Sequence, residues 1–195
     1  MDRRPLRLRF VGSATRVGQL PPTQSEVAFV GRSNVGKSAL VNALANTKQL
    51  ARVSNTPGRT QLINLFEIET GATLVDLPGY GYAKVPDRVR RDWPAMIEGY
   101  LLDREELVQV FVLADAVIGP TPLDVQMLDW LRANAVPHTV VATKIDKVKP
   151  SRRERRRRDL AAGCGLEPAD VVWTSATKGD GIDELRDRVV AHLVI

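Results

Sequence analysis

An octapeptide with the sequence GRSNVGKS, Gly31–Ser38, restricts the possible folds of this chain more than any other feature. It directly follows the apolar run Glu26–Val30, and a helical pattern begins near Lys37. The octapeptide fits the pattern G-x-x-x-x-G-K-[ST], in which the glycines let the backbone curl so that its N–H groups point inward at a phosphate. A strand, a phosphate-binding loop and a helix are therefore expected in this order.

Apolar, β-rich runs alternate with helical patterns along the whole chain. The runs expected to form strands are 26–30, 61–69, 73–77, 107–115, 138–144 and 170–175. The helical patterns begin near Lys37, Asp87, Leu123, Ser151 and Asp183. This alternation is typical of a doubly wound, mostly parallel sheet between two helical layers. Only a short link with Gly71 and Ala72 separates the second run from the third, which predicts a hairpin and one antiparallel edge strand. The expected fold class is α/β, with three layers around a six-stranded sheet.

The length and composition suit one compact domain. The chain has 195 residues, 44% of them hydrophobic, so residues 21–195 are expected to form one domain and residues 1–20 a basic N-terminal extension. No run approaches the roughly 18–20 apolar residues that span a bilayer, and MDRRPLRLRF lacks the apolar stretch of a secretory signal. We therefore expect a cytoplasmic protein that makes no membrane contact.

The net charge of +5 is concentrated in a short segment. Between Ser151 and Asp159 lies RRERRRR, whose six arginines and one glutamate also sum to +5. The first twenty residues form a second basic patch. Such patches on an otherwise neutral chain suit contact with nucleic acid or another acidic surface, and a solvated helix face is the alternative interpretation.

Two segments predict how a nucleotide phosphate and its metal ion are bound. Lys37 can reach the β- and γ-phosphates, and the Ser38 hydroxyl can ligate Mg²⁺. The segment Asp76–Gly79, DLPG, follows an apolar strand, and its carboxylate can hold a magnesium-bound water while the glycine N–H contacts the γ-phosphate. Taken alone this tetrapeptide is an ordinary turn signal, and the preceding phosphate loop favours the functional interpretation.

Two further strand ends predict guanine recognition. Thr143–Asp146 reads TKID, and the Asp146 carboxylate can accept hydrogen bonds from the ring N1–H and the 2-amino group of guanine. The stem of Lys144 can lie across the base, and Ser175–Ala176 can offer a backbone N–H to the guanine O6. Because ligands bind at the carboxyl ends of the strands in doubly wound sheets, these segments predict a site for GTP or GDP with Mg²⁺.

With these motifs in this order, the chain resembles the GTPases of the Era-like superfamily, specifically the EngB (YihA) family. The segments that carry the resemblance are NTPGRTQLINLF, VDLPGYGYAKV, RRDWPAMIEGYLLDREEL and DVQMLDWL, and the likeness covers most of residues 25–185. The resemblance implies a molecular switch that hydrolyses GTP to GDP and phosphate, acts in assembly of the large ribosomal subunit and is needed for normal cell division and septation. It also implies that Thr60 is the switch threonine that ligates Mg²⁺ beside Ser38, and that 58–62 belongs to the nucleotide site.

Three positions depart from related patterns. Thr143 stands where many GTPases have asparagine, and AVIG follows Asp115 where the family usually has a basic residue. Tyr80 occupies the position at which Ras-like proteins place the glutamine that orients the attacking water. The alternative function is therefore a binding module that depends on GTP occupancy and hydrolyses negligibly.

The resemblance completes the set of expected site residues. The nucleotide contacts are expected from Gly31, Arg32, Ser33, Asn34, Val35, Gly36, Lys37, Ser38, Gly58, Arg59, Thr60, Gln61, Leu62, Asp76, Leu77, Pro78, Gly79, Thr143, Lys144, Ile145, Asp146, Thr174, Ser175, Ala176 and Thr177. Catalytic roles are expected for Lys37, Asn34 and Thr60, and the metal ligands are Ser38 and Thr60. Some relatives in the superfamily bind K⁺ through an asparagine at the position of Asn34, so K⁺ is a further candidate cofactor and slow hydrolysis stimulated by K⁺ or a partner is expected. The expected partner is the large ribosomal subunit or its precursor, contacted through ribosomal RNA by a monomer with no stable protein partner.

Overall fold

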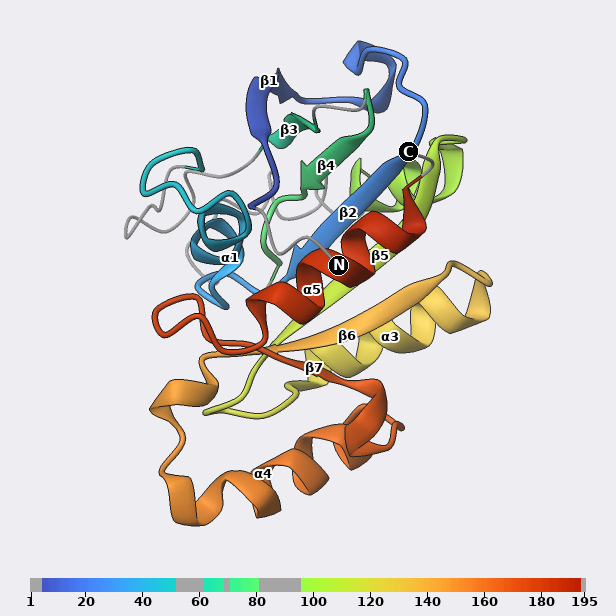
Figure 1. Cartoon of the computed structure of the whole chain (residues 1–195). Coiled ribbons are helices and arrows are strands. Elements are labelled where there is room, and N and C mark those ends of the chain that lie inside the picture. Colours follow the sequence, from blue (N-terminus) through green and yellow to red (C-terminus); the bar gives the residue numbers. More distant parts are fainter. Residues whose placement is uncertain (1–4, 52–61, 69–70, 81–95, 194–195) are drawn as a thin grey trace.

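The computed structural model describes residues 5–51, 62–68, 71–80 and 96–193. Within these residues seven strands form one sheet, in the order β1-β3-β4-β2-β5-β6-β7 (Figure 1). The strands are β1 (Leu8–Ala14), β2 (Glu26–Gly31), β3 (Ile63–Ile68), β4 (Thr73–Asp76), β5 (Leu107–Asp115), β6 (His138–Thr143) and β7 (Val172–Trp173). Neighbouring strands from β4 to β7 pair in parallel, whereas β3 is antiparallel to both β4 and β1. The predicted α/β class with a mostly parallel sheet is confirmed.

The sheet has one strand more than predicted, because part of the basic N-terminal segment pairs with it. Strand β1 runs antiparallel to β3, from Leu8 opposite Ile68 to Ala14 opposite Ile63. The hairpin of β3 and β4 forms as expected, but β3 is covered by β1 and is not the edge of the sheet. Phe10 and Val11 are 48% and 43% exposed. An edge strand that buries so little leaves a weak hydrophobic pattern in the sequence, which is why the strand was not predicted.

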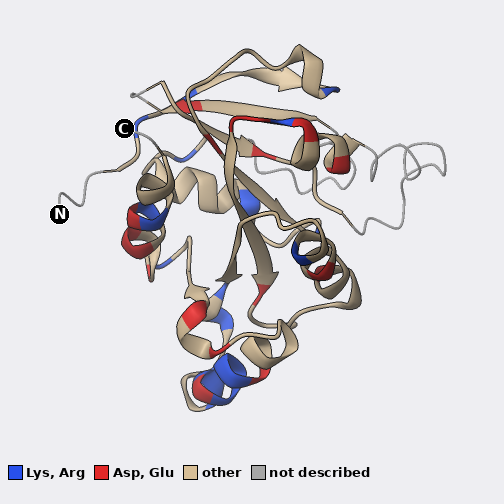
Figure 2. Ribbon diagram, turned by 90° about the vertical axis from the view of Figure 1, so that its right-hand side faces the viewer, with Lys and Arg blue, Asp and Glu red and all other residues tan. Residues whose placement is uncertain are grey.

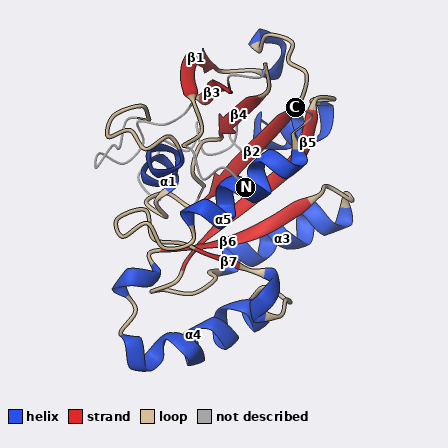
Figure 3. Ribbon diagram, in the orientation of Figure 1, coloured by secondary structure: helices blue, strands red, loops and turns tan. Residues whose placement is uncertain are grey.

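Helices cover both faces of the sheet (Figure 3). They are α1 (Lys37–Leu44), α3 (Pro122–Ala133), α4 (Pro150–Gly163) and α5 (Ile182–His192), with short 3-10 turns at Val17–Gln19, Ile145–Lys147 and Pro168–Asp170. The helix expected near Asp87 would begin outside the described residues, and residues 96–103 are helical. No helix in the described ranges is long and apolar enough to cross a membrane.

Alternation along the central strands builds a separate core on each face of the sheet. Val27 and Phe29 of β2 pack with α1 and α5 on one side. Ala28 and Val30 face the other side, where they pack with α3, α4 and the helical residues 96–103. All six residues of β2 are buried, as expected for a central parallel strand covered on both faces. The rigid strand ends therefore fix the positions of the loops that follow them.

A buried charge anchors the opposite end of β2. The carboxylate of Glu26 accepts hydrogen bonds from the hydroxyls of Thr73 and Tyr100, at 2.8 and 2.9 Å. The Arg104 guanidinium donates to it through two nitrogens, at 2.9 and 3.0 Å, and both side chains are almost completely buried. Burial, together with the negative charge of Glu26, raises the pKa of Tyr100 well above its usual value. This network joins β2 and β4 to the end of the helical segment 96–103.

Candidate nucleotide-binding site

The loop between β2 and α1 depends on two glycines. A Cβ at Gly31 would lie 3.0 Å from both the Cβ and the carbonyl oxygen of Leu113 on β5, so a larger residue would push the loop away from the sheet. Gly36 has a φ of +111° and stands at the N-terminal cap of α1, a conformation that glycine adopts without strain. Because the first N–H groups of a helix have no partner within the helix, the loop and the start of α1 present donors that suit an anion.

Lys37 and Asp76 meet beneath this loop. The Nζ of Lys37 lies 3.7 Å from the Oδ1 of Asp76, and both side chains are buried. At this distance the two groups form an ion pair but no hydrogen bond. Oδ1 has no hydrogen-bond partner among the described residues. Burial raises the pKa of the Asp76 carboxyl, and the charge of Lys37 opposes the rise. A second cation beside Asp76 would therefore lower the cost of keeping this carboxylate ionised. Ser38 is half-buried in the same first turn of α1.

The DLPG segment lies directly against the loop after β2. The N–H of Ser33 donates to the carbonyl of Tyr80 at 2.9 Å, and the N–H of Tyr80 donates to the carbonyl of Gly31 at 3.3 Å. The Ser33 hydroxyl also donates to the carbonyl of Gly79 at 3.2 Å. A Cβ at Gly79 would lie 3.0 Å from the Ser33 backbone, so a larger residue would push the two segments apart. The two predicted phosphate-binding segments are thus held side by side.

Tyr80 points its hydroxyl at α3. The hydroxyl donates a 2.7 Å hydrogen bond to Oδ1 of Asp124, which is itself buried. The other oxygen of Asp124 accepts from the N–H and the hydroxyl of Thr121 and so caps α3. Burial, reinforced by the charge of Asp124, raises the pKa of Tyr80 well above its usual value and keeps it a neutral donor. The Tyr80 hydroxyl is therefore occupied by its hydrogen bond to Asp124 of α3. Tyr80 also has no amide with which to orient a water molecule.

The predicted guanine motifs surround a cavity of about 150 Å³. They come from the ends of β6 and β7, and the start of α1 closes the third side. The lining residues are Gly36, Ala39, Leu40, Thr143, Lys144, Asp146, Lys147, Thr174, Ala176 and Thr177. Three segments far apart in the sequence therefore meet at the carboxyl edge of the sheet, as expected for a doubly wound fold.

Lys144 and Thr143 connect the guanine motif to the phosphate loop. Lys144 has a φ of 60°, and its Nζ donates to the carbonyl of Asn34 at 2.6 Å and to Oδ2 of Asp115 at 2.7 Å. The hydroxyl of Thr143 donates to the carbonyl of Val35 at 2.7 Å. A hydroxyl at the position where many GTPases have asparagine therefore still joins the two loops.

Asp115 is the main residue of this site that the sequence did not predict. Its Oδ2 holds the Lys144 ammonium, and its Oδ1 accepts from the backbone N–H groups of Val117 and Ile118. The available signal was an acidic residue that ends an apolar strand, the same signal that identified Asp76. Ala39, Leu40 and Lys147 also line the cavity without having been predicted.

Other predicted positions contribute to the loops or lie outside the described residues. The predicted residues 58–61 belong to the undescribed segment 52–61, and Leu62 is half-buried just before β3. Leu77, Ile145 and Ser175 are buried and support the loops. Arg32 forms an isolated parallel bridge with Tyr80, and Asn34 is exposed with a φ of 65°.

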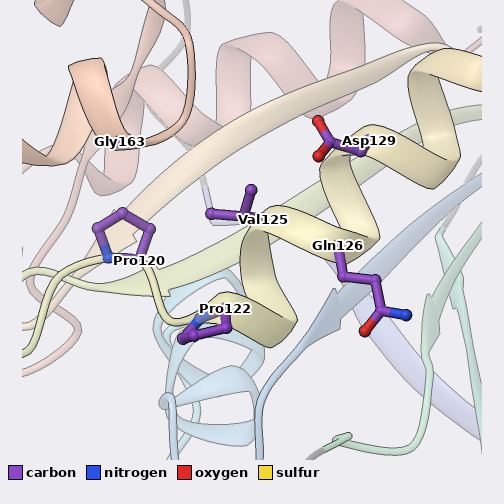
Figure 4. Close-up of a pocket in the computed structure, with 6 residues that line it drawn as sticks. All are labelled: Pro120, Pro122, Val125, Gln126, Asp129 and Gly163. Atoms are coloured by element: carbon purple, nitrogen blue, oxygen red, sulfur yellow. The ribbon is translucent and has the colours of Figure 1, made fainter.

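A second hollow of about 570 Å³ lies between the start of α3 and the end of α4 (Figure 4). Pro120, Pro122 and Val125 give it an apolar lining, and Gln126, Asp129 and Gly163 complete it. None of these six residues belongs to the phosphate or guanine motifs. The hollow is therefore separate from the candidate nucleotide site.

The three-layer fold, the glycine-rich loop and the guanine motifs around one cavity define a P-loop GTPase. The family model described as "50S ribosome-binding GTPase" matches residues 26–144. The chain belongs to this family and, within it, to the EngB group of GTP-binding proteins.

Curated relatives and solved structures resemble most of the chain. Over 183 residues it is 45% identical to a probable GTP-binding protein EngB of Geotalea daltonii, covering 93% of this chain and 88% of the relative. It is 46% identical over 188 residues to the corresponding protein of Ruegeria pomeroyi, covering 94% and 86%.

The crystal structure of a probable GTP-binding protein EngB matches with a TM-score of 0.69 at 24% identity. The match covers 86% of this chain and 97% of that one, and it shows that the two share a fold. Era in complex with MgGDPNP and nucleotides 1506–1542 of 16S ribosomal RNA also has a TM-score of 0.69, at 26% identity, and covers 90% of this chain and 58% of that one.

Proposed function

We propose that this protein is a molecular switch that binds GTP, hydrolyses it to GDP and phosphate, and acts in assembly of the large ribosomal subunit. The observation that carries the proposal is the meeting of the phosphate loop, DLPG and both guanine motifs at one edge of the sheet. Lys37 would contact the β- and γ-phosphates, Gly79 the γ-phosphate, and Asp146 the N–H groups of guanine. The relatives' names and the family description support this assignment.

Mg²⁺ fits the residues at the phosphate end of the site. Ser38 and Thr60 would be its protein ligands, and Asp76 would hold one of its water molecules. The buried Oδ1 of Asp76, which has no hydrogen-bond partner among the described residues, supports this assignment, because an adjacent dication would offset the cost of burying that charge. When bound, the ion would neutralise charge on the β- and γ-phosphate oxygens.

Asn34 is a candidate ligand for K⁺, which would add positive charge where many GTPases use an arginine finger. Its left-handed backbone supports a simpler interpretation, because asparagine tolerates positive φ better than most residues. We expect slow hydrolysis that is faster in K⁺ than in Na⁺, with the difference lost in Asn34→Ala. The measurement is the single-turnover rate in each salt at equal ionic strength.

Asn34→Gly is the matched control, because glycine keeps the positive φ and also removes the amide. Loss of the K⁺ effect in both variants supports a ligand role for the side chain. Equal wild-type rates in K⁺ and Na⁺ would end the idea.

Helix α4 is the proposed contact surface for ribosomal RNA, and Figure 2 shows Lys and Arg gathered on it. Two of its arginines pair along the helix, Arg155 with Asp159 at 3.5 Å and Arg158 with Glu154 at 3.3 Å. These pairs are exposed and contribute little stability. The surplus positive charge of the run is therefore available to phosphates.

Replacing Arg155–Arg158 with alanine should weaken binding to the large subunit and leave GTP affinity nearly unchanged. The salt dependence of subunit binding should become shallower, by about 0.7–0.9 log units per lost phosphate contact. The measurement is subunit affinity at several salt concentrations, with GTP affinity as the folding control. An unaltered slope would mean that the run is only a solvated helix face.

The second candidate function is a GTP-dependent binding module with negligible hydrolysis. The hydrogen bond from Tyr80 to Asp124 favours it, because Tyr80 stands where Ras-like proteins have the glutamine that orients the attacking water. Multiple-turnover hydrolysis with and without large ribosomal subunits tests the proposed switch against it. The switch predicts a rate that rises with subunits, whereas the module predicts no turnover in either condition.

We also propose that the protein acts in the cytoplasm as a monomer and is needed for normal cell division and septation.

A further inference from the structure

A polar cleft of about 550 Å³ lies between α4, the turn at Pro168–Asp170 and the start of α5. Arg153 and Arg157, four residues apart on α4, form one wall, and Trp173 of β7 also lines the cleft. Asp180 and Glu184 contribute carboxylates. The arginines of the run therefore lie in two environments. Arg155 and Arg158 are largely in solvent, whereas Arg153 and Arg157 line the cleft.

Arg157 lies over an aromatic ring, and one of its own hydrogen-bond donors has no partner among the described residues. Its guanidinium carbon lies 5.5 Å from the centroid of the Trp173 ring, a cation–π distance. The indole N–H of Trp173 donates to the carbonyl of Pro168 at 3.0 Å, which fixes the ring. The Nε of Arg157 is buried and has no hydrogen-bond partner among the described residues. A buried donor without a partner is costly, so the position of Arg157 depends on its contact with the Trp173 ring.

The charges in the cleft suit a planar ring better than a bare phosphate. Among the described residues neither Asp180 nor Glu184 forms an ion pair with Arg153 or Arg157, and Glu184 instead pairs with Arg188. The cleft thus has guanidinium donors and carboxylate acceptors, and the carboxylates would repel a phosphate. Nucleobases carry both donors and acceptors on their edges and stack on arginine planes.

We propose that this cleft binds one unpaired base of the RNA that α4 contacts, with the base stacked on the planar guanidinium of Arg157, which lines the cleft. The inference rests on the proposed RNA contact of α4 and adds base recognition to it. Phosphates of the same strand would lie along Arg155 and Arg158. The cleft adjoins the nucleotide site, because Ile145, which lines the cleft, lies between Lys144 and Asp146 of the guanine motif.

The test compares RNA with and without bases. The probes are single-stranded homopolymers of A, C, G or U about ten nucleotides long, together with an abasic strand of the same length, measured by fluorescence anisotropy. Because stacking is worth about 1–3 kcal/mol per base, wild type should bind the best homopolymer roughly 5- to 150-fold tighter than the abasic strand. Arg157→Lys keeps the charge but removes the plane and the Nε donor, so this ratio should fall toward one.

Arg155→Ala is the matched control, because it removes charge from the same helix outside the cleft. It should weaken binding of both strands and leave their ratio unchanged, and GTP affinity should be equal in all three proteins. If wild type binds the abasic strand as tightly as every homopolymer, or Arg157→Lys leaves the ratio unchanged, base binding in the cleft is overturned and the phosphate contact stands. If wild type binds no RNA at all, the proposed RNA contact fails, and the cleft assignment fails with it.

Discussion

Asp146→Asn is expected to weaken GTP binding by about 2–4 kcal/mol, roughly 30- to 1,000-fold. Asp146 lines the cavity at the end of β6, where the carboxylate would accept both N–H groups on the edge of guanine. The variant places an amide donor opposite one of these groups. Xanthine has an oxygen in place of the 2-amino group and can accept from that amide, so affinity for xanthosine triphosphate should rise relative to GTP. Calorimetric titration with both nucleotides measures the change.

Asp129→Asn is the matched control for this prediction. It makes the same chemical change on an exposed residue of α3, which pairs with Arg132 and lies outside the nucleotide cavity. Its affinity for GTP should equal that of wild type. Equal GTP affinity in Asp146→Asn and wild type would refute the assignment of Asp146 to guanine.

Glu26→Gln is expected to lower the free energy of unfolding by about 3–5 kcal/mol, the usual cost of removing one partner from a buried ion pair. Glutamine has nearly the same shape, but its NH₂ group would face donors where a carboxylate oxygen now accepts from Thr73, Tyr100 and Arg104. The Arg104 charge would also remain buried without its main counter-ion. Urea unfolding in the absence of nucleotide measures the difference.

The exposed pair of Arg9 and Glu67 provides the comparison. Their side chains are 73% and 39% exposed, so Glu67→Gln should cost no more than about 1 kcal/mol. A similar loss in both variants would show that the Glu26 network contributes no more than a surface ion pair.

The central architecture could be predicted because local signals and burial agree there. The octapeptide Gly31–Ser38 lies between β2 and α1 as expected, and β2, β5 and β6 lie in continuous apolar runs. Helices α3, α4 and α5 begin within a residue of their predicted starts, and Thr121 caps α3. Strand β1 was missed because its pairing with β3 joins residues 49 to 60 positions apart and buries little apolar surface.

Long-range side-chain contacts explain the parts of the site that the sequence did not predict. The bond of Lys144 to Asp115, and that of Tyr80 to Asp124, depend on how strand ends and a helix start meet in space. The arginine run was expected to be either a basic patch for nucleic acid or a solvated helix face. Its division between solvent and the cleft follows from the way α4 packs beside β7, which brings Arg157 over Trp173.

Co-sedimentation with purified large ribosomal subunits tests the central proposal most directly. The protein is loaded with GDP or with a non-hydrolysable GTP analogue, and small subunits serve as the control particle. A GTP-controlled switch that acts on the large subunit predicts that the protein pellets with large subunits in the analogue, pellets less in GDP, and stays in the supernatant with small subunits. Equal pelleting in the two nucleotides, or no pelleting in either, would contradict the account.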